Sequence, residues 1–245
     1  RNNLMKKFLS VLALLLLVVQ GSYAQKKFSA YGVAFYNQEN LFDTCHDEGK
    51  NDYAFLPTGS YRWNGLKYKN KLHNMARALA DLGTDVLPGV GCAVIGLSEV
   101  ENNKVLDALV AQPELAARGY KYCHVEGPDK RGIDCALLYN PALFSVRDVK
   151  LVPYVYDLPK DSARATRGFL TVSGTMAGEH LTVVVCHWPS RGASSHYREI
   201  AGTQVKAVKD SLLRDDPNCK VMVMGDMNDD PTNKSMTDCL SCKPE

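Results

Sequence analysis

The sequence lacks an excess of charge of either sign. It carries 29 Lys and Arg residues against 27 Asp and Glu residues. Without Arg1, Lys6 and Lys7, residues 25–245 hold 26 basic and 27 acidic side chains, a net charge of −1. A strongly basic field dominates non-specific binding of nucleic acids. The net charge of residues 25–245 therefore excludes binding of long nucleic acids through an overall positive charge. Binding through a local basic patch stays possible.

Repeats, low-complexity segments and Pro- or Gly-rich linkers are absent after residue 24. Their absence excludes solenoid and multi-domain arrangements. The chain is 45% hydrophobic and 23% charged, which is enough for one core of substantial size. We therefore predict a single domain over residues 25–245.

Paired cysteine motifs are scarce. The one Cys-x-x-Cys sequence, Cys239 to Cys242, has no second pair and no flanking histidines, which argues against a zinc site. Eight cysteines can pair in an exported chain, but several lie in apolar runs where a buried thiol is the more frequent role. The pairing of the cysteines stays open.

The N-terminus has the pattern of a secretory signal. Two lysines precede the apolar run Phe8–Val19, and Ser22-Tyr23-Ala24 provides a cleavage site. The run is too short for a secure membrane span, and no stop-transfer pattern follows. We predict a signal peptide at residues 1–24, with residues 1–4 as upstream leader, and export to the periplasm or the extracellular space. The sequence therefore predicts no membrane span.

Strands and helices are predicted to interleave along the chain. Apolar runs predict strands at Gly32–Tyr36, Val94–Glu101, Ile133–Tyr139, Phe169–Ser173, Leu181–Cys186 and Val221–Met224. Helical spacing predicts helices at Leu72–Leu82, after the capping residue Asn102, and at Ser195–Leu213. An antiparallel hairpin is expected through Gly174–His180. The pattern indicates a mixed sheet packed by helices.

Polar side chains follow several of these strands: Asn37, Glu99, His187 and the pair Asp226 and Asn228. Sheet folds gather strand ends along one rim, so these groups have a reason to converge. Asp226 and Asn228 would point the same way if the strand stays extended that far. Carboxylates and amides suit a hard cation such as Mg²⁺, which prefers oxygen ligands.

Five segments together resemble the endonuclease/exonuclease/phosphatase superfamily, which includes DNase I-like nucleases, sphingomyelinases and inositol-phosphate phosphatases. In chain order they are Val33–Phe42 (VAFYNQENLF), Ile95–Val100 (IGLSEV), Arg131–Tyr139 (RGIDCALLY), His187–Arg191 (HWPSR) and Met224–Pro231 (MGDMNDDP). The likeness covers Tyr31 to Ser235. It implies an α+β fold: a two-sheet β-sandwich flanked by helices, the four-layer α/β/β/α arrangement of DNase I.

The resemblance also implies roles for the strand-end residues. Glu99 is similar to the family's metal-binding glutamate, and Asn37 to the asparagine beside it. Asp226 resembles the aspartate that orients or activates water, and Asn228 the asparagine that contacts the scissile phosphate. His187 is similar to the histidine that stabilises charge on a phosphoryl oxygen.

Four further residues lie in family-like loops where the resemblance implies binding of substrate phosphate: Arg131, Asp134, Arg191 and Arg198. Structural alternatives stand beside these roles. Glu99 can be an exposed strand-end charge, and His187 a packed core histidine. Arg191 and Arg198 can be solvated charges, and we favour that interpretation for Arg198. Asp134 can cap a turn, and Asn37 can be a turn residue.

One departure from the family concerns the C-terminal end. Family members close with a further strand that ends in an Asp-His pair, whereas this sequence has 19 residues after Asp226 and no histidine among them. We expect the domain to be incomplete at its C-terminus, without its last strands. A chain that ends here is expected to lose the roughly two to four orders of magnitude that a positioned base contributes.

The resemblance implies a hydrolase that uses Mg²⁺ or Mn²⁺ to direct in-line attack of water on a phosphodiester or phosphomonoester. Separately, we expect the chain to be a monomer, although the sequence leaves the oligomeric state open. The substrate stays open between nucleic acid, a lipid head group and an inositol phosphate. The alternative is a catalytically impaired remnant that binds a phosphorylated ligand or a protein partner without turnover.

Overall fold

The computed structural model describes residues 29–156 and 166–243 of the chain. Tyr31 to Glu245 form one compact unit. The predicted signal peptide lies outside the described residues. No helix among the described residues is long and apolar enough to cross a membrane.

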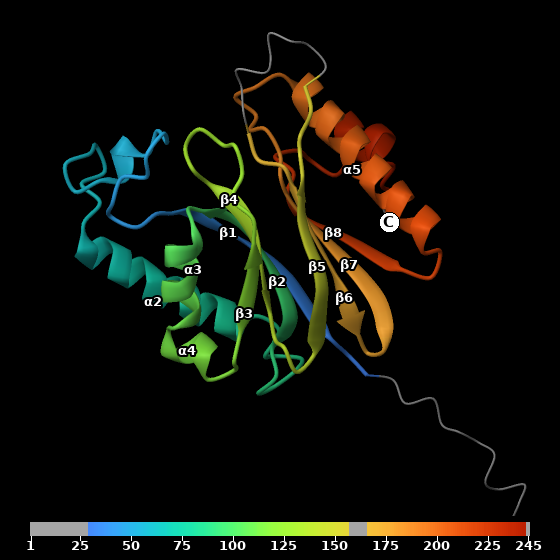
Figure 1. Ribbon diagram of the computed structural model, residues 1–245, viewed down its shortest axis with the longest axis horizontal. Coiled ribbons are helices and arrows are strands. Elements are labelled where there is room, and N and C mark those ends of the chain that lie inside the picture. The colour runs from blue at the N-terminus through green and yellow to red at the C-terminus, as the bar shows by residue number, and fades with distance from the viewer. Residues whose placement is uncertain (1–28, 157–165, 244–245) are drawn as a thin grey trace, which may run out of the picture. The chain divides into compact units, whose positions relative to one another are not determined.

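Two four-stranded sheets form the centre of this unit (Figure 1). Sheet A contains β1 (Gly32–Leu41), β2 (Cys92–Val100), β3 (Lys121–His124) and β4 (Asp134–Tyr139), in the order β1-β2-β4-β3. Sheet B contains β5 (Phe144–Val152), β6 (Phe169–Met176), β7 (Glu179–His187) and β8 (Lys220–Asp226), in sequence order. Both sheets are mixed, as predicted, because β1 pairs with β2 and β7 with β8 in parallel.

Helices cover the outer faces of both sheets (Figure 1). Sheet A carries α2 (Gly65–Asp81), α3 (Asn103–Val110) and α4 (Pro113–Ala116), and sheet B carries α5 (Ser195–Asp215). Short turns of helix occur at Tyr53–Phe55 (η1) and Ser235–Cys239 (η3). The α3 helix begins as predicted, because Asn102 Oδ1 accepts bonds from two backbone N–H groups of the first turn.

Three apolar layers hold the four structural layers together. One lies between sheet A and its helices and includes Leu72, Leu79 and Leu106. A second lies between the two sheets, and a third, around Trp188, lies between sheet B and α5. Burial of these side chains is the main stabilising contribution to such a fold. The predicted α/β/β/α sandwich is therefore the observed architecture.

Several predicted boundaries are wrong. The β6–β7 hairpin has no loop at Gly174–His180, because both strands continue to a tight turn at Ala177 and Gly178, where φ is 54° and 79°. β1 continues past Tyr36 to Leu41. β3, β5 and α4 were not predicted from the sequence. All eight cysteines belong to the described residues, are free, and four of them are buried, as expected for thiols in strands.

Candidate active site

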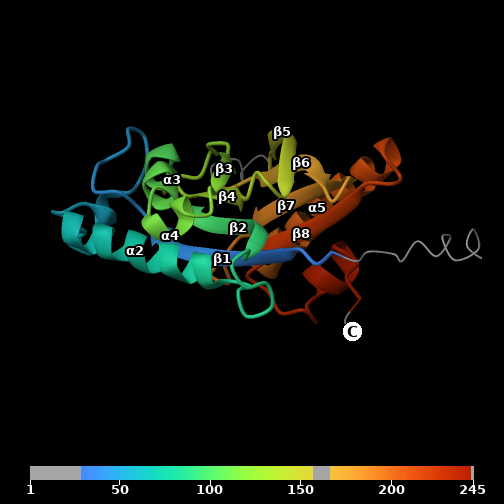
Figure 2. The ribbon, with the colours of Figure 1, turned by 90° about the horizontal axis from the view of Figure 1, so that it is seen from below.

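The carboxyl ends of the two parallel strand pairs meet where the sheets come together. β1 and β8 are edge strands of sheets A and B, and they contact each other across the sandwich. Figure 2 shows the β1–β2 pair beside the β7–β8 pair. This arrangement brings strand ends from both sheets to one rim, as the sequence predicts.

Glu99 occupies a bulge near the end of β2. The register of β2 against β4 shifts between Ser98 and Val100, so Glu99 is an unpaired extra residue. Its φ is 60°, a left-handed conformation that costs a non-glycine residue free energy. A bulge re-aims a side chain out of the regular alternation of a strand. The Glu99 side chain is only 14% exposed, so the alternative of an exposed strand-end charge is wrong.

The segment after β8 turns sharply instead of remaining extended. Asp226 Oδ1 accepts a hydrogen bond from the backbone N–H of Asn228 at 2.9 Å, and Asn228 has a φ of 52°. The side chains of Asp226 and Asn228 were predicted to point the same way only if the strand stayed extended to Asn228. The strand does not stay extended that far. Asn228 Nδ2 instead donates to the carbonyl oxygen of Trp188 at 3.0 Å, beside the end of β7.

Contacts across the two sheets join the predicted residues into one cluster. Asn37 Nδ2 donates to Asp226 Oδ2 at 3.1 Å, while Asn37 Oδ1 accepts from the backbone N–H of Glu39. His187 Nε2 lies 3.6 Å from Glu99 Oε1. His187 and Asp226 are also register partners in the β7–β8 pair. The structure thus brings Asn37, Glu99, His187, Asp226 and Asn228 together.

His187 is a neutral side chain. It is 4% exposed, and no partner of its Nδ1 atom occurs among the described residues. Burial, followed by the positive charges of Arg167 and Arg131, lowers its pKa from 6.5 to about 2. A neutral imidazole can still donate one N–H bond, but it supplies no positive charge. His187 is therefore buried, as the interpretation of a packed core histidine requires. It also lies beside Glu99 in the cluster, as its assignment to the site requires.

The four loop residues differ in their surroundings. Arg131 is exposed, and its Nη1 lies 3.4 Å from Asn40 Oδ1 on β1. Arg191 is also exposed and donates from Nε to the Asn228 carbonyl oxygen at 3.1 Å. Both guanidinium groups therefore flank the cluster on the solvent side, where contact with substrate is open to them.

Arg198 and Asp134 are internal. Arg198 is 6% exposed, so the prediction of a solvated helix charge is wrong. Its Nε lies 3.0 Å from Asp229 Oδ1, and its Nη1 donates to the carbonyl oxygens of Ser190 and Ala193. Asp134 is 2% exposed and accepts from the N–H of Gly127, which agrees with the turn-capping alternative. Both side chains thus hold neighbouring loops in place.

Two nearby cations were missed from the sequence. Lys71, on α2, donates from Nζ to the Glu39 carbonyl oxygen at 2.6 Å. Burial lowers the pKa of Lys71, although the charges of Glu39 and Glu99 act in the opposite direction. Arg167 is buried beside Trp188. Neither residue lies in a recognisable motif, and the predicted helix began at Leu72, one residue after Lys71.

The donor groups at this rim fit a hydrated hard cation. Among the described residues, no group of three or more His, Cys, Asp and Glu side chains is arranged to hold a metal ion. Mg²⁺, however, usually keeps several water ligands and needs only one or two carboxylates. The Glu99 carboxylate meets that need, because it accepts no hydrogen bond within the described residues and faces a neutral imidazole.

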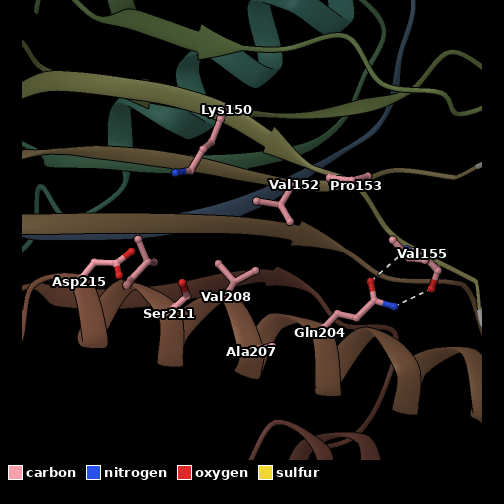
Figure 3. Close-up of a pocket in the computed structure, with 10 residues that line it drawn as sticks. Lys150, Val152, Pro153, Val155, Gln204, Ala207, Val208, Ser211 and Asp215 are labelled. Carbon is pink, nitrogen blue, oxygen red and sulfur yellow. Dashed lines mark hydrogen bonds between the residues drawn. The ribbon is translucent and has the colours of Figure 1, made fainter.

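A separate hollow lies away from this cluster (Figure 3). Its volume is about 570 Å³, and it lies between the end of β5 and α5. Gln204 closes one end by exchanging two hydrogen bonds with the backbone of Val155, at 3.0 and 2.6 Å. None of the predicted site residues lines this hollow.

Solved structures with the same fold include two phosphatases. A mannosyl-6-phosphatase from Bacteroides thetaiotaomicron is 19% identical with a TM-score of 0.57, covering 86% of this chain and 70% of its own. ANGEL2, a 2′,3′-cyclic phosphatase, is 15% identical with a TM-score of 0.54, covering 84% and 55%. A humanized TDP2 from D. rerio is 14% identical with a TM-score of 0.53, covering 87% and 68%. The matched part of this chain thus spans 55% to 70% of these structures' length.

A search of curated proteins gave no match. The model of the Endonuclease/Exonuclease/phosphatase family matches residues 32–245, most of the chain. The match begins at β1 and includes every residue of the rim cluster. The protein therefore belongs to the endonuclease/exonuclease/phosphatase family.

Proposed function

We propose that this protein is a divalent-metal-dependent phosphoesterase that hydrolyses a phosphodiester or phosphomonoester by in-line attack of water. The observation that carries the proposal is the cluster itself. Asp226 accepts hydrogen bonds from Asn37 and from the Asn228 backbone, His187 lies 3.6 Å from Glu99, and His187 and Asp226 are register partners. The family description names hydrolytic activities on phosphate esters, and the cluster supplies groups for that chemistry.

We assign to Asp226 the roles of orienting the attacking water and accepting its proton. Each of its oxygens already accepts one fixed N–H donor, from Asn37 and from Asn228, and each keeps a free lone pair. A carboxylate held in this way needs little reorganisation during the reaction. Asp226 is therefore the group we assign to the water molecule.

We assign Asn228 and His187 to binding of the phosphoryl oxygens. Asn228 Nδ2 uses one hydrogen for the Trp188 carbonyl, which leaves the second for a phosphate oxygen. For His187 we assign the Nε2 tautomer, whose N–H would be the donor, and Nε2 lies 3.6 Å from Glu99 Oε1. Donors aimed at developing negative charge lower the barrier of phosphoryl transfer.

Glu99 is the residue we assign to Mg²⁺ or Mn²⁺. A bound cation would neutralise phosphoryl oxygens and lower the pKa of coordinated water. Asn37 holds Asp226 through its amide nitrogen, and its amide oxygen, which accepts one bond from Glu39, keeps a lone pair for the cation. Arg131 and Arg191 are exposed and are assigned to steering the anionic substrate.

The test is hydrolysis of bis(p-nitrophenyl) phosphate and p-nitrophenyl phosphate by the full-length protein with MgCl₂ or MnCl₂. We expect turnover that EDTA abolishes and that Glu99→Gln reduces by about two orders of magnitude or more. Glu179→Gln, at the exposed opposite end of β7, is the matched control and should retain activity. Equal turnover in Glu99→Gln and wild type would refute the assignment. Binding of phosphate without any turnover would favour the remnant.

Substrate identity, export and oligomeric state are further parts of the proposal. A panel of single-stranded DNA, RNA, sphingomyelin, inositol phosphates, a 2′,3′-cyclic nucleotide and mannose 6-phosphate would identify the preferred ester.

Residues 1–24 are proposed to direct export. Cell fractionation would test this proposal, because an exported protein should be recovered outside the cytoplasm without this segment. The exported chain is proposed to be a monomer, which light scattering would test.

A further inference from the structure

Arg167 is a buried arginine directly before β6 that the assigned roles leave out. It is 8% exposed, and its guanidinium contacts two acceptors. Nη1 donates to Asp129 Oδ2 at 2.9 Å, and Nη2 donates to the carbonyl oxygen of Trp188 at 3.1 Å. The two acceptors lie in segments that follow different sheets, so one side chain connects sheet A to sheet B.

The Trp188 carbonyl is shared between Arg167 and Asn228. Asn228 Nδ2 donates to the same oxygen at 3.0 Å. The Trp188 N–H donates to the Asp226 carbonyl at 2.9 Å, so both sides of this residue's backbone are tied into the site. The position of one carbonyl oxygen thus sets the orientation of the Asn228 amide, and Arg167 holds the same oxygen.

Asp129, which forms an ion pair with Arg167, also contacts Arg131. Asp129 Oδ1 accepts a hydrogen bond from the Arg131 backbone N–H at 2.9 Å. The Arg131 side chain reaches Asn40 on β1. The Asp129–Arg167 pair therefore connects the loop that carries Arg131 to the backbone that holds Asn228. A planar guanidinium is suited to this bridge, because it presents several donors in a fixed geometry.

We propose that Arg167 is a positioning residue that acts on the reaction through Asn228. The proposal rests on the proposed function, because Asn228 is assigned there to a phosphoryl oxygen. A buried ion pair is weak evidence for a contribution to stability alone, since its desolvation cost is high. The shared carbonyl gives this pair a specific role, because it keeps the second hydrogen of the Asn228 amide directed at substrate.

The test compares Arg167→Lys with Arg118→Lys. Lysine retains the charge beside Asp129 but lacks the planar fork that reaches two acceptors. We expect kcat to fall roughly 10- to 100-fold, the range seen when a group that orients a direct ligand is lost, and KM to stay within about twofold. Arg118 also donates to a backbone carbonyl, that of Ala80, but lies away from the cluster, so its lysine variant should retain full activity.

A double-mutant cycle separates positioning from a general structural role. In an Asn228→Ala background, Arg167→Lys should cause no further loss of kcat, because the residue it positions is absent. A full additional loss in that background, or wild-type kcat in the single variant, would overturn the proposal. If the Arg167→Lys protein is not cooperatively folded, the Asp129→Asn variant is used in its place. Asparagine weakens the contact with Arg167 but keeps an oxygen that accepts the Arg131 N–H.

A second readout does not depend on activity. The side-chain amide signals of Asn228 in a ¹H–¹⁵N spectrum, assigned by their loss in Asn228→Asp, should shift in Arg167→Lys and stay unchanged in Arg118→Lys. Unshifted signals in Arg167→Lys would contradict the coupling. An inactive wild type with the expected shift would instead refute the proposed function and leave the coupling between Arg167 and Asn228 intact.

Discussion

Asn37 Nδ2 donates a hydrogen bond to Asp226 Oδ2 at 3.1 Å, although the two residues are 189 positions apart and lie in different sheets. The other carboxylate oxygen of Asp226 accepts from the Asn228 backbone. The orientation of this carboxylate therefore depends on how one sheet packs against the other. A group that orients a reacting side chain contributes to catalysis without contacting the substrate.

Replacement of Asn37 tests this cross-sheet contact. Asn37→Ala removes the donor and frees Asp226 to rotate, so we expect kcat to fall about 10-fold with little change in KM. Asn218→Ala, in an exposed turn before β8, is the control and should match wild type. Steady-state kinetics on the best substrate of the panel is the measurement. Unchanged kcat in Asn37→Ala would show that Asp226 needs no such support.

The left-handed backbone of Glu99 predicts an inverted glycine effect. Glu99→Gly and Glu99→Ala both remove the carboxylate, but only alanine retains the Cβ that is strained at a φ of 60°. The glycine variant should be the more stable of the two by about 1 kcal/mol. Urea unfolding of both variants gives this difference.

The control pair for Glu99 lies in the exposed part of α2. At Lys69 the order should reverse, with the alanine variant more stable than the glycine variant by about 1 kcal/mol, because glycine is unfavourable inside a helix. A glycine variant at position 99 that is less stable than the alanine variant would contradict the left-handed conformation.

The buried Arg198–Asp229 pair predicts a pH-dependent loss of stability. Although burial raises the pKa of Asp229, hydrogen bonds from Ser235, Asn233 and Arg198 outweigh it and lower the pKa below 3.8. The ionised carboxylate therefore stabilises the fold above pH 3.8, and this contribution is lost as the pH falls through the lowered pKa. Asp229→Asn should destabilise the protein by about 3 kcal/mol at pH 7, and the difference should shrink below pH 3.8.

Asp230→Asn is the matched control for that measurement. Asp230 is the next residue along the loop and pairs with Arg191, but its side chain is 64% exposed. Exposed pairs contribute little, so its replacement should change the unfolding free energy by less than about 1 kcal/mol. Urea unfolding at several pH values measures the loss of unfolding free energy in each variant. Similar losses in both variants would argue against a buried role for Asp229.

Gly225 is required by the close approach of β7 and β8. A Cβ at this position would lie 2.1 Å from the Cys186 carbonyl oxygen, and the φ of Gly225 is 154°. Gly225→Ala should therefore separate the strands next to Asp226, reduce kcat and destabilise the fold by more than about 2 kcal/mol. At Gly65, where an added Cβ meets no atom within 4 Å, alanine should be neutral or stabilising. A stable, active Gly225→Ala variant would contradict the observed pairing.

Local sequence was sufficient to predict the main strands and a mixed sheet packed by helices, whereas the four-layer architecture followed from the family resemblance. Glu99, His187 and Asp226 each follow an apolar run whose length and composition specify a buried strand. Their convergence follows from sheet geometry, and the order of the motifs indicates the family. The bulge at Glu99 was not predictable, because nothing in the run Val94–Val100 marks the residue that leaves the ladder.

Tertiary partners determined the features that sequence reasoning missed. β5 was overlooked because a register shift between Val146 and Asp148 interrupts its alternation of apolar and polar residues. Arg198 was predicted to be solvated, since an arginine on a helix is usually exposed, but Asp229 from a distant loop neutralises it inside the fold. Arg167 is hidden for the same reason, because its partners Asp129 and Trp188 are remote in sequence.

Asp226→Asn tests most directly the claim that polar side chains from four strands form one phosphoester-hydrolysing site. The measurement is the metal-dependent kcat of the full-length protein and of this variant on the same substrate, with circular dichroism to establish equal folding. We predict a fall of about three orders of magnitude, because the amide cannot accept the proton of water. A folded variant whose kcat stays within threefold of wild type would contradict the claim.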